Sequence, residues 1–270
     1  MIVGPHQLGP GIYLLSTGAQ QGYLVDLALG SGGNGSTWVW IDPGPAEALP
    51  DLLEKTRELL GPELERLALL VASHLDPDAL GAIPELCRRA RRARVMMPQE
   101  TWNFASLTGI PEARVVIAER FRHGFRLPET GRGFDVVLTP YSQYTAAFLL
   151  YEPQSATLFS ADLLAGGGDV QSAAPRWATD CDWPRVAAYQ MRHMPCSAAI
   201  RWSLEQIAAL PRLELICPHH GGLLRGEVMR SFLARLGELP VGADLLAGPG
   251  EAAPNLVSSA AAPPSCQPAS

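Results

Sequence analysis

Histidine and aspartate alternate along one short segment of the chain, in the order His74, Asp76 and Asp78. An apolar run over residues 67–72, which predicts a buried strand, comes directly before this segment. The strand fixes the backbone, and the loop after it can aim one imidazole and two carboxylates at a common point. These side chains are common metal ligands, so the segment predicts a metal site.

Three later segments carry polar side chains in a similar setting, each after a predicted strand. They contain Gln143 within the segment 139–144, Asp162 two residues after Ser160, and the pair His219-His220 before two glycines. Each segment is weak evidence when it is taken alone. Four of them in this order favour a site in which residues far apart in the sequence converge.

The order and spacing of the four segments resemble the metallo-β-lactamase superfamily. Within it they are most similar to the β-lactamase-like domain of flavodiiron proteins and of related oxygen-binding di-iron proteins. The segments 39–44 and 140–151 add weaker matches, and the resemblance covers about residues 10 to 240. It implies an α/β fold, namely a four-layer αββα metallo-β-lactamase-like sandwich.

The resemblance also implies a set of metal ligands, with one carboxylate shared by two ions. The positions that match are His74, Asp76, Asp78, Asp162 and His220, with Gln143 as a weaker amide ligand. One ion is expected at His74, Asp76, Gln143 and Asp162, and the other at Asp78, Asp162 and His220. Such an oxygen-rich set suits iron, so a di-iron cofactor is expected, with manganese or zinc as alternatives.

The chain departs from the family pattern at three of these positions. Asp76 stands in place of Glu, while Ala79 and Gln143 stand where the family has His. Gln143 offers an amide in place of an imidazole at the first ion, and Ala79 has no donor atom at the second, so each ion loses one nitrogen ligand. His219 is interpreted as a spare imidazole beside the ligand His220.

Each candidate residue also has a plainer interpretation. Asp76, Pro77 and Asp78 can form the start of a helix, as N-cap, first residue and first-turn acid. Asp162 can be a polar residue that ends a strand, and Gln143 an ordinary loop residue. The combination of segments favours the metal site over these interpretations.

Three functions remain open from the sequence. The first is a di-iron domain that binds a small oxidant such as O2 or NO, or that reduces it as an oxidoreductase. The second is a divergent, non-catalytic member of the family that binds a ligand or a partner, which Ala79 and Gln143 favour. The third is a metal-dependent hydrolase. No flavodoxin domain fits after residue 240, so no FMN is expected and an electron-donor protein would supply electrons. The resemblance further implies a homodimer.

Composition sets broader limits. The net charge of −6 disfavours nucleic acid as a partner, even though residues 88–94 form a basic cluster. The scattered cysteines lack CxxC spacing, and neither a signal peptide nor a membrane-spanning run is visible, so a cytoplasmic protein is expected. Alternating strands and helices, including helices over 46–60 and 78–89, predict one domain over residues 1–245. An Ala-, Pro- and Ser-rich tail over 246–270 is expected to be disordered.

Overall fold

The computed structural model of the protein describes residues 3–17, 20–29, 37–128, 130–167 and 175–246. Within these ranges the strands form two sheets. The first has seven strands in the order β1-β2-β3-β4-β5-β6-β7, and the second has six in the order β13-β12-β11-β10-β9-β8.

The first sheet changes from antiparallel to parallel pairing at its centre. Its strands are β1 (Val3–Gly9), β2 (Ile12–Ser16), β3 (Gln21–Asp26), β4 (Trp38–Ile41), β5 (Leu67–Val71), β6 (Arg94–Met97) and β7 (Val115–Ile117). The pairs from β1 to β4 are antiparallel and those from β4 to β7 are parallel. Parallel neighbours need crossover connections, which here contain α1 (Leu49–Leu60), α2 (Pro77–Leu80), α3 (Ile83–Arg89) and α4 (Gln99–Ala105).

The second sheet is antiparallel except at one pair. It contains β8 (Phe125–Arg126), β9 (Gly133–Leu138), β10 (Phe148–Glu152), β11 (Thr157–Ala161), β12 (Leu215–Pro218) and β13 (Leu224–Arg225). β11 and β12 run parallel, and the chain between them forms α5 (Trp183–His193) and α6 (Ser197–Ala208). α7 (Gly226–Gly237) follows β13.

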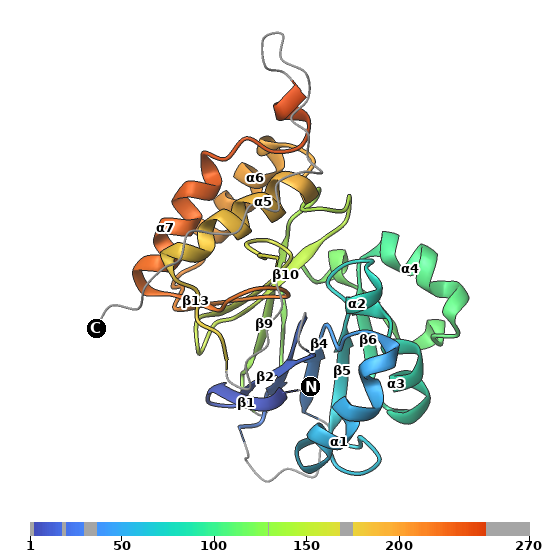
Figure 1. The fold of residues 1–270 in the computed structure, drawn as a ribbon. Helices are drawn as coiled ribbons and strands as arrows, with labels where there is room; N and C mark the ends of the chain where they lie inside the picture. Colours follow the sequence, from blue (N-terminus) through green and yellow to red (C-terminus); the bar gives the residue numbers. More distant parts are fainter. Residues whose placement is uncertain (1–2, 18–19, 30–36, 129, 168–174, 247–270) are drawn as a thin grey trace.

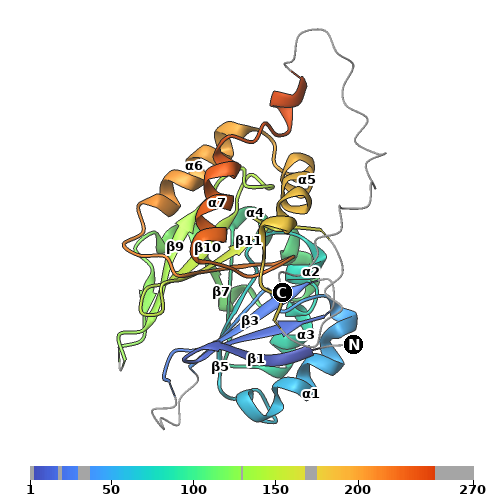
Figure 2. The same cartoon turned by 60° about the vertical axis from the view of Figure 1, so that its left-hand side comes forward.

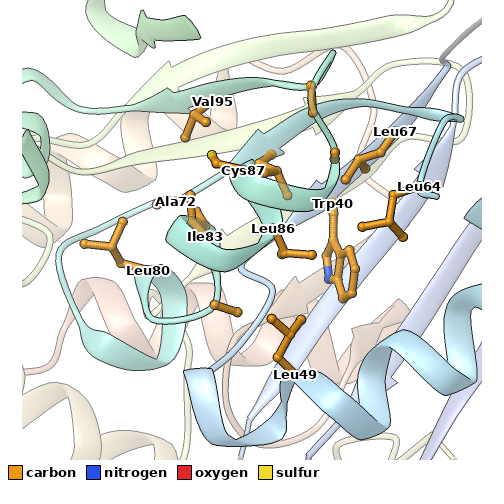
Figure 3. Close-up of a cluster of buried hydrophobic side chains, with 14 of the residues drawn as sticks. Trp40, Leu49, Leu64, Leu67, Ala72, Leu80, Ile83, Leu86, Cys87 and Val95 are labelled. Carbon is orange, nitrogen blue, oxygen red and sulfur yellow. The ribbon is translucent and has the colours of Figure 1, made fainter. Parts of the chain in front are cut away.

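Three hydrophobic clusters hold the layers together. The helices α1 to α4 lie outside the first sheet, and α5 to α7 cover the second (Figure 1, Figure 2). One cluster joins the first sheet to its helices, where Trp40 meets Leu49 of α1 and Leu86 of α3 (Figure 3). A second joins the other sheet to its helices, and a third, which contains Val39 and Phe159, lies between the sheets. The predicted four-layer αββα sandwich is confirmed.

The helix predicted over residues 78–89 is in fact two helices, α2 and α3, that meet at Gly81 and Ala82. The backbone amide of Ala82 donates to the carbonyl oxygen of Gly44 at 3.0 Å, which draws it out of the helical pattern. Pro84, which has no amide hydrogen, then occupies the first turn of α3. The break leaves α2 as a single short turn directly after the His74 segment.

Two strands escaped prediction. β13 has only two residues, and β1 contains Pro5 at the edge of its sheet, where the missing amide is tolerated. The predicted tail lies outside the described residues except for Leu246. The division into a domain and a tail stays a prediction.

The cysteines of the described residues differ in their bonding. Cys87, Cys196 and Cys217 are free, whereas Cys181 is disulfide-bonded. Cys266 lies outside the described residues. In the described ranges, no helix has both the length and the apolar character that crossing a membrane requires.

Candidate metal centre

The candidate residues lie where β5, β11 and β12 end. Asp162 directly follows β11, and His219 and His220 follow β12. Because β11 and β12 are parallel, their carboxyl ends lie at the same edge of the second sheet. The loop after β5 brings the Nε2 atom of His74 to 3.5 Å from one oxygen of Asp162, and His220 Nε2 lies 3.8 Å from the other. The two sheets therefore contribute side chains to one cluster.

The donor atoms form two groups on either side of Asp162. His74, Asp76 and Asp162 make the first group, and Asp78, His219 and His220 the second; within each group the donor atoms lie within 4.8 Å of one another. Asp78 spans the groups, because its Oδ1 is 3.9 Å from His74 Nε2 and its Oδ2 is 3.1 Å from His220 Nε2. All five residues matched as firm ligands are thus brought together.

Most of these donor atoms have no hydrogen-bond partner although they are buried. Both carboxylate oxygens of Asp162, Oδ1 of Asp78, Nε2 of His74 and both ring nitrogens of His219 share this property. Buried polar atoms are almost always paired, and an unpaired carboxylate is particularly costly. Oxygen and imidazole donors that face one another are what a site for divalent cations requires. The residues present therefore fit a metal centre.

The hydrogen bonds of Ser73 fix the protonation of His74. The Ser73 hydroxyl donates to Asp42 at 2.8 Å, because a carboxylate can only accept, and its oxygen lies 2.7 Å from His74 Nδ1. Having one proton, the hydroxyl must then accept a hydrogen bond from Nδ1. The assignment leaves a lone pair on His74 Nε2, which faces the carboxylates of the cluster as a metal ligand would.

Asp76 occupies the N-cap position of α2, as the plainer interpretation predicted, but its side chain forms no capping hydrogen bond. Its carboxylate instead accepts from Gln143 Nε2 at 2.8 Å and from the hydroxyl of Tyr144. Gln143 therefore lies at the cluster, with φ of 69° and with its buried Oε1 atom unpartnered. It reaches Asp76 through nitrogen, so ion binding through its oxygen requires the amide to turn.

Ala79 is fully buried in α2 and offers no donor. His219 is only 1% exposed, and its Nε2 atom lies 3.6 Å from Oδ2 of Asp78, a residue of the same helix α2. Burial opposes its charged form, but interaction with Asp78 and the negative charges of Asp42 and Asp162 raise the pKa of His219 to about 9. Burial likewise opposes ionisation of Asp78, yet His219 and His220 hold the pKa of that carboxyl well below its usual range. The imidazole of His219 and the carboxylate of Asp78 thus stabilise each other's charged forms.

Several contributors at the cluster were missed as site residues. Asp42 and Ser73 orient His74 from 31 residues apart, which no local pattern reveals. Tyr189 and His193 stack with ring centroids 4.2 Å apart, and the Tyr189 ring lies 5.9 Å from that of His220. Tyr189 and His193 are four residues apart on α5, which places them on one face of the helix. This spacing is the one sequence feature that could have indicated that they lie together.

Two tyrosines at the cluster keep their protons. Burial, followed by the hydrogen bond to Asp76, raises the pKa of Tyr144 to about 12. Burial and the charge of Asp162 raise the pKa of Tyr189 well above its usual value. Both phenols are therefore neutral near pH 7, and Tyr144 donates its one proton to Asp76.

Comparison with known proteins agrees with this geometry. The sequence model of the family described as "ODP family beta lactamase" matches residues 32–221. "Putative diflavin flavoprotein A 4" of Synechocystis sp. is 28% identical over 208 residues, which cover 71% of this chain and 32% of that protein. "Type A flavoprotein fprA" of Rhodobacter capsulatus is 29% identical over 123 residues, which cover 45% of this chain and 26% of that protein. The chain thus spans about a third or less of these relatives.

Solved structures share the fold. The structure called "Peroxy diiron species of chemotaxis sensor ODP" has a TM-score of 0.73 at 20% identity and covers 92% of this chain and 97% of its own. The flavodiiron protein from Giardia intestinalis has a TM-score of 0.71 at 17% identity and covers 88% of this chain and 59% of its own.

Proposed function

Because the chain belongs to the ODP family of β-lactamase-like proteins, we propose that it is a di-iron-type domain that binds a small oxidant such as O2 or NO. The observation that carries the proposal is the set of buried donor atoms without partners, grouped around Asp162. One ion would be held by His74, Asp76 and Asp162, and the other by Asp78, His220 and Asp162. Asp162 would be the shared ligand.

Iron is the favoured metal, with manganese and zinc as alternatives, because carboxylate oxygens outnumber imidazoles in the assigned set. When bound, two irons would supply the electrons that a small oxidant takes up. The protein's own side chains prepare the site for that ligand. Ser73 orients His74, Asp76 is held by Gln143 and Tyr144, and the layers of the sandwich keep most of the cluster away from solvent.

The neutral phenol of Tyr189 has a further role in this proposal. Its O–H group could donate a hydrogen bond to negative charge on a small oxidant bound at the cluster. Tyr189 is positioned by its stacking on His193, whereas Tyr144 donates its proton to Asp76 and so holds that carboxylate in place. In this proposal a partner protein donates the electrons, and the domain forms a homodimer, as the family resemblance implies.

One observation favours a second candidate, in which the domain binds a ligand or partner without turning it over. The amide nitrogen of Gln143 already occupies one oxygen of Asp76, and Ala79 offers no donor. Both features weaken ion binding compared with a complete set of ligands. Such a domain would keep the fold and use the cluster for recognition.

Anaerobic reconstitution with Fe²⁺ tests the proposal. We expect about two irons per chain, together with a new visible absorption band when O2 or NO is added to the reduced protein. An absence of bound metal in a folded protein would favour the second candidate. Zinc in the aerobically purified protein together with esterase turnover would instead favour a hydrolase.

A further inference from the structure

We propose that His219 is a ligand of the second ion, beside Asp78 and His220, and that it supplies the imidazole that α2 lacks at Ala79. This inference rests on the proposed metal-binding function and extends it to a residue outside the assigned ligand set. It makes the second ion site richer in nitrogen than the first, which contains His74 as its one imidazole.

The spacing of the donor atoms fits one ion. Ligands at about 2.1 Å from a cation lie about 3.0 to 3.4 Å from each other in octahedral or tetrahedral geometry. The oxygen Oδ2 of Asp78 lies 3.1 Å from Nε2 of His220 and 3.6 Å from Nε2 of His219. The three donor atoms lie within 4.8 Å of one another, so small movements of the side chains would bring them onto one ion.

The orientation of His219 points the same way. Its backbone amide donates to Ala161 at 2.7 Å, and its carbonyl oxygen accepts from Gln21 at 2.8 Å, so β11 and β3 both fix its position. The ring presents Nδ1 to Asp42 at 3.8 Å and Nε2 to Asp78. An imidazole with a carboxylate beside one nitrogen and a cation at the other is a recurrent arrangement in metalloproteins.

An ordinary core histidine explains the observations less well. His219 is 1% exposed, and neither of its ring nitrogens has a hydrogen-bond partner. A structural histidine at such a depth would be expected to form at least one hydrogen bond. Its ring also contacts those of both other histidines, with centroid distances of 4.7 Å to His220 and 5.6 Å to His74. His219 therefore belongs to the donor cluster rather than to the packing around it.

Titration of the metal-free protein with Co²⁺ tests the inference without any activity assay, because bound cobalt reports its coordination in its visible spectrum. The wild type should bind two equivalents. His219→Asn keeps an amide near the position of Nδ1 but removes the Nε2 donor, so the second ion should bind at least about 100-fold more weakly, which exceeds the usual effect of losing a neighbouring hydrogen bond. The first equivalent should bind almost as before.

His219→Ala provides a second variant should the asparagine variant unfold, and the exposed His123→Asn is the matched control. A nitrogen NMR titration of the wild type with Zn²⁺ adds a direct readout, because coordination shifts the Nε2 resonance of His219. Two unchanged cobalt equivalents in a folded His219 variant, or an unshifted Nε2 resonance in the zinc-loaded wild type, would overturn this assignment and leave the proposed function intact. Failure of the wild type to bind any metal would overturn the proposed function itself.

Discussion

Two clusters of buried charge lie at opposite ends of β11, and they differ in how their polar atoms are satisfied. Before β11, Glu152 accepts hydrogen bonds from the amides of Gln154 and Ser155 and pairs with Arg132 at 3.4 Å. Arg132 donates further to the carbonyl oxygens of Asp26 and Pro10, each at 2.8 Å, and only its Nε atom lacks a partner. After β11, Asp162 has no hydrogen-bond partner for either oxygen.

The difference separates a structural cluster from the proposed metal centre. The protein itself satisfies Glu152 and all of Arg132 except Nε, and this cluster fastens the turn before β11 to the first sheet. The cluster around Asp162 places carboxylate oxygens and an imidazole lone pair face to face, an arrangement that the proposed cations would complete. Burial of charge alone therefore does not point to a site, whereas several buried donors without partners in one place do.

The largest expected effect is at Asp162. Asp162→Ala should remove both ions, because the proposed shared ligand is lost, and metal content after reconstitution should fall from about two per chain to near zero. Stability of the ion-free protein should change little, since no hydrogen bond is lost. Elemental analysis and urea unfolding measure the two effects, and full metal occupancy in the variant would contradict the shared role.

The opposite pattern is expected at Glu152. Removing one partner from a buried, hydrogen-bonded ion pair costs about 3–5 kcal/mol. Glu152→Ala should therefore lower the free energy of unfolding by about that amount in urea while metal content per folded chain stays unchanged. The exposed Glu58→Ala on α1 is the control, and a stability loss no larger than its own would show that Glu152 is not structural.

An intermediate effect is expected at Ser73. Loss of a group that orients a metal ligand typically reduces metal affinity about 10- to 100-fold. Ser73→Ala should weaken the ion held by His74 by this factor, because the hydrogen bond that sets the tautomer of His74 disappears. Competition with a chelator measures the change, with the exposed Ser106→Ala as control. Unchanged affinity would mean that the Asp42–Ser73 pair serves packing only.

A smaller effect is expected in the pH dependence of stability, to which Glu152 of the structural cluster contributes. Burial opposes ionisation of Glu152, but hydrogen bonds from Ser155 and Arg132 and the charge of Arg132 lower the pKa of Glu152 below its ordinary value of 4.5. A carboxyl with a lowered folded-state pKa stabilises the protein fully above its unfolded-state pKa, and this contribution is lost as pH falls through the folded-state value. Glu152→Gln should therefore flatten the decline in unfolding free energy below about pH 4.5, and an unchanged slope would assign that decline to other groups.

The smallest effect is expected at Tyr144, whose hydroxyl occupies one oxygen of Asp76. Tyr144→Phe frees that oxygen for a cation, and a net hydrogen-bond contribution of about 1 kcal/mol corresponds to a few-fold gain in affinity for the first ion. Isothermal titration calorimetry with Co²⁺ measures this gain, with the exposed Tyr141→Phe as control. Weaker binding would show instead that Tyr144 positions Asp76 for the ion.

Much of the fold could be predicted because its signals are local. Apolar runs such as residues 67–71 mark the buried strands, and the periodicity of α1 marks an amphipathic helix. The boundary between α2 and α3 could not be predicted, since it depends on a hydrogen bond from Ala82 to Gly44, which lies in another segment. Edge strands such as β13 are too short to carry any pattern.

The residues of the candidate site also differ in whether local sequence signals reveal them. His74, Asp162 and His220 could be found because each follows a strand and matches a familiar order of residues. The environment of His219 could not, because its burial and its approach to Asp42 arise only when the two sheets pack together. Because His219 directly precedes His220 in the sequence, it was interpreted as a spare imidazole. In the packed structure its ring lies among the other donors of the cluster.

The donor cluster draws on both sheets, since His74 and Asp78 follow β5 and His220 follows β12. The second ion of the proposal, held by Asp78 and His220, would act as a reversible crosslink that closes a loop of roughly 140 residues, and closing so long a loop removes much freedom from the unfolded chain. In the proposed assignment, each ion takes ligands both from the segment after β5 and from the segments after β11 or β12. Metal capture should accordingly come late in folding, and a loaded ion should delay the separation of the sheets.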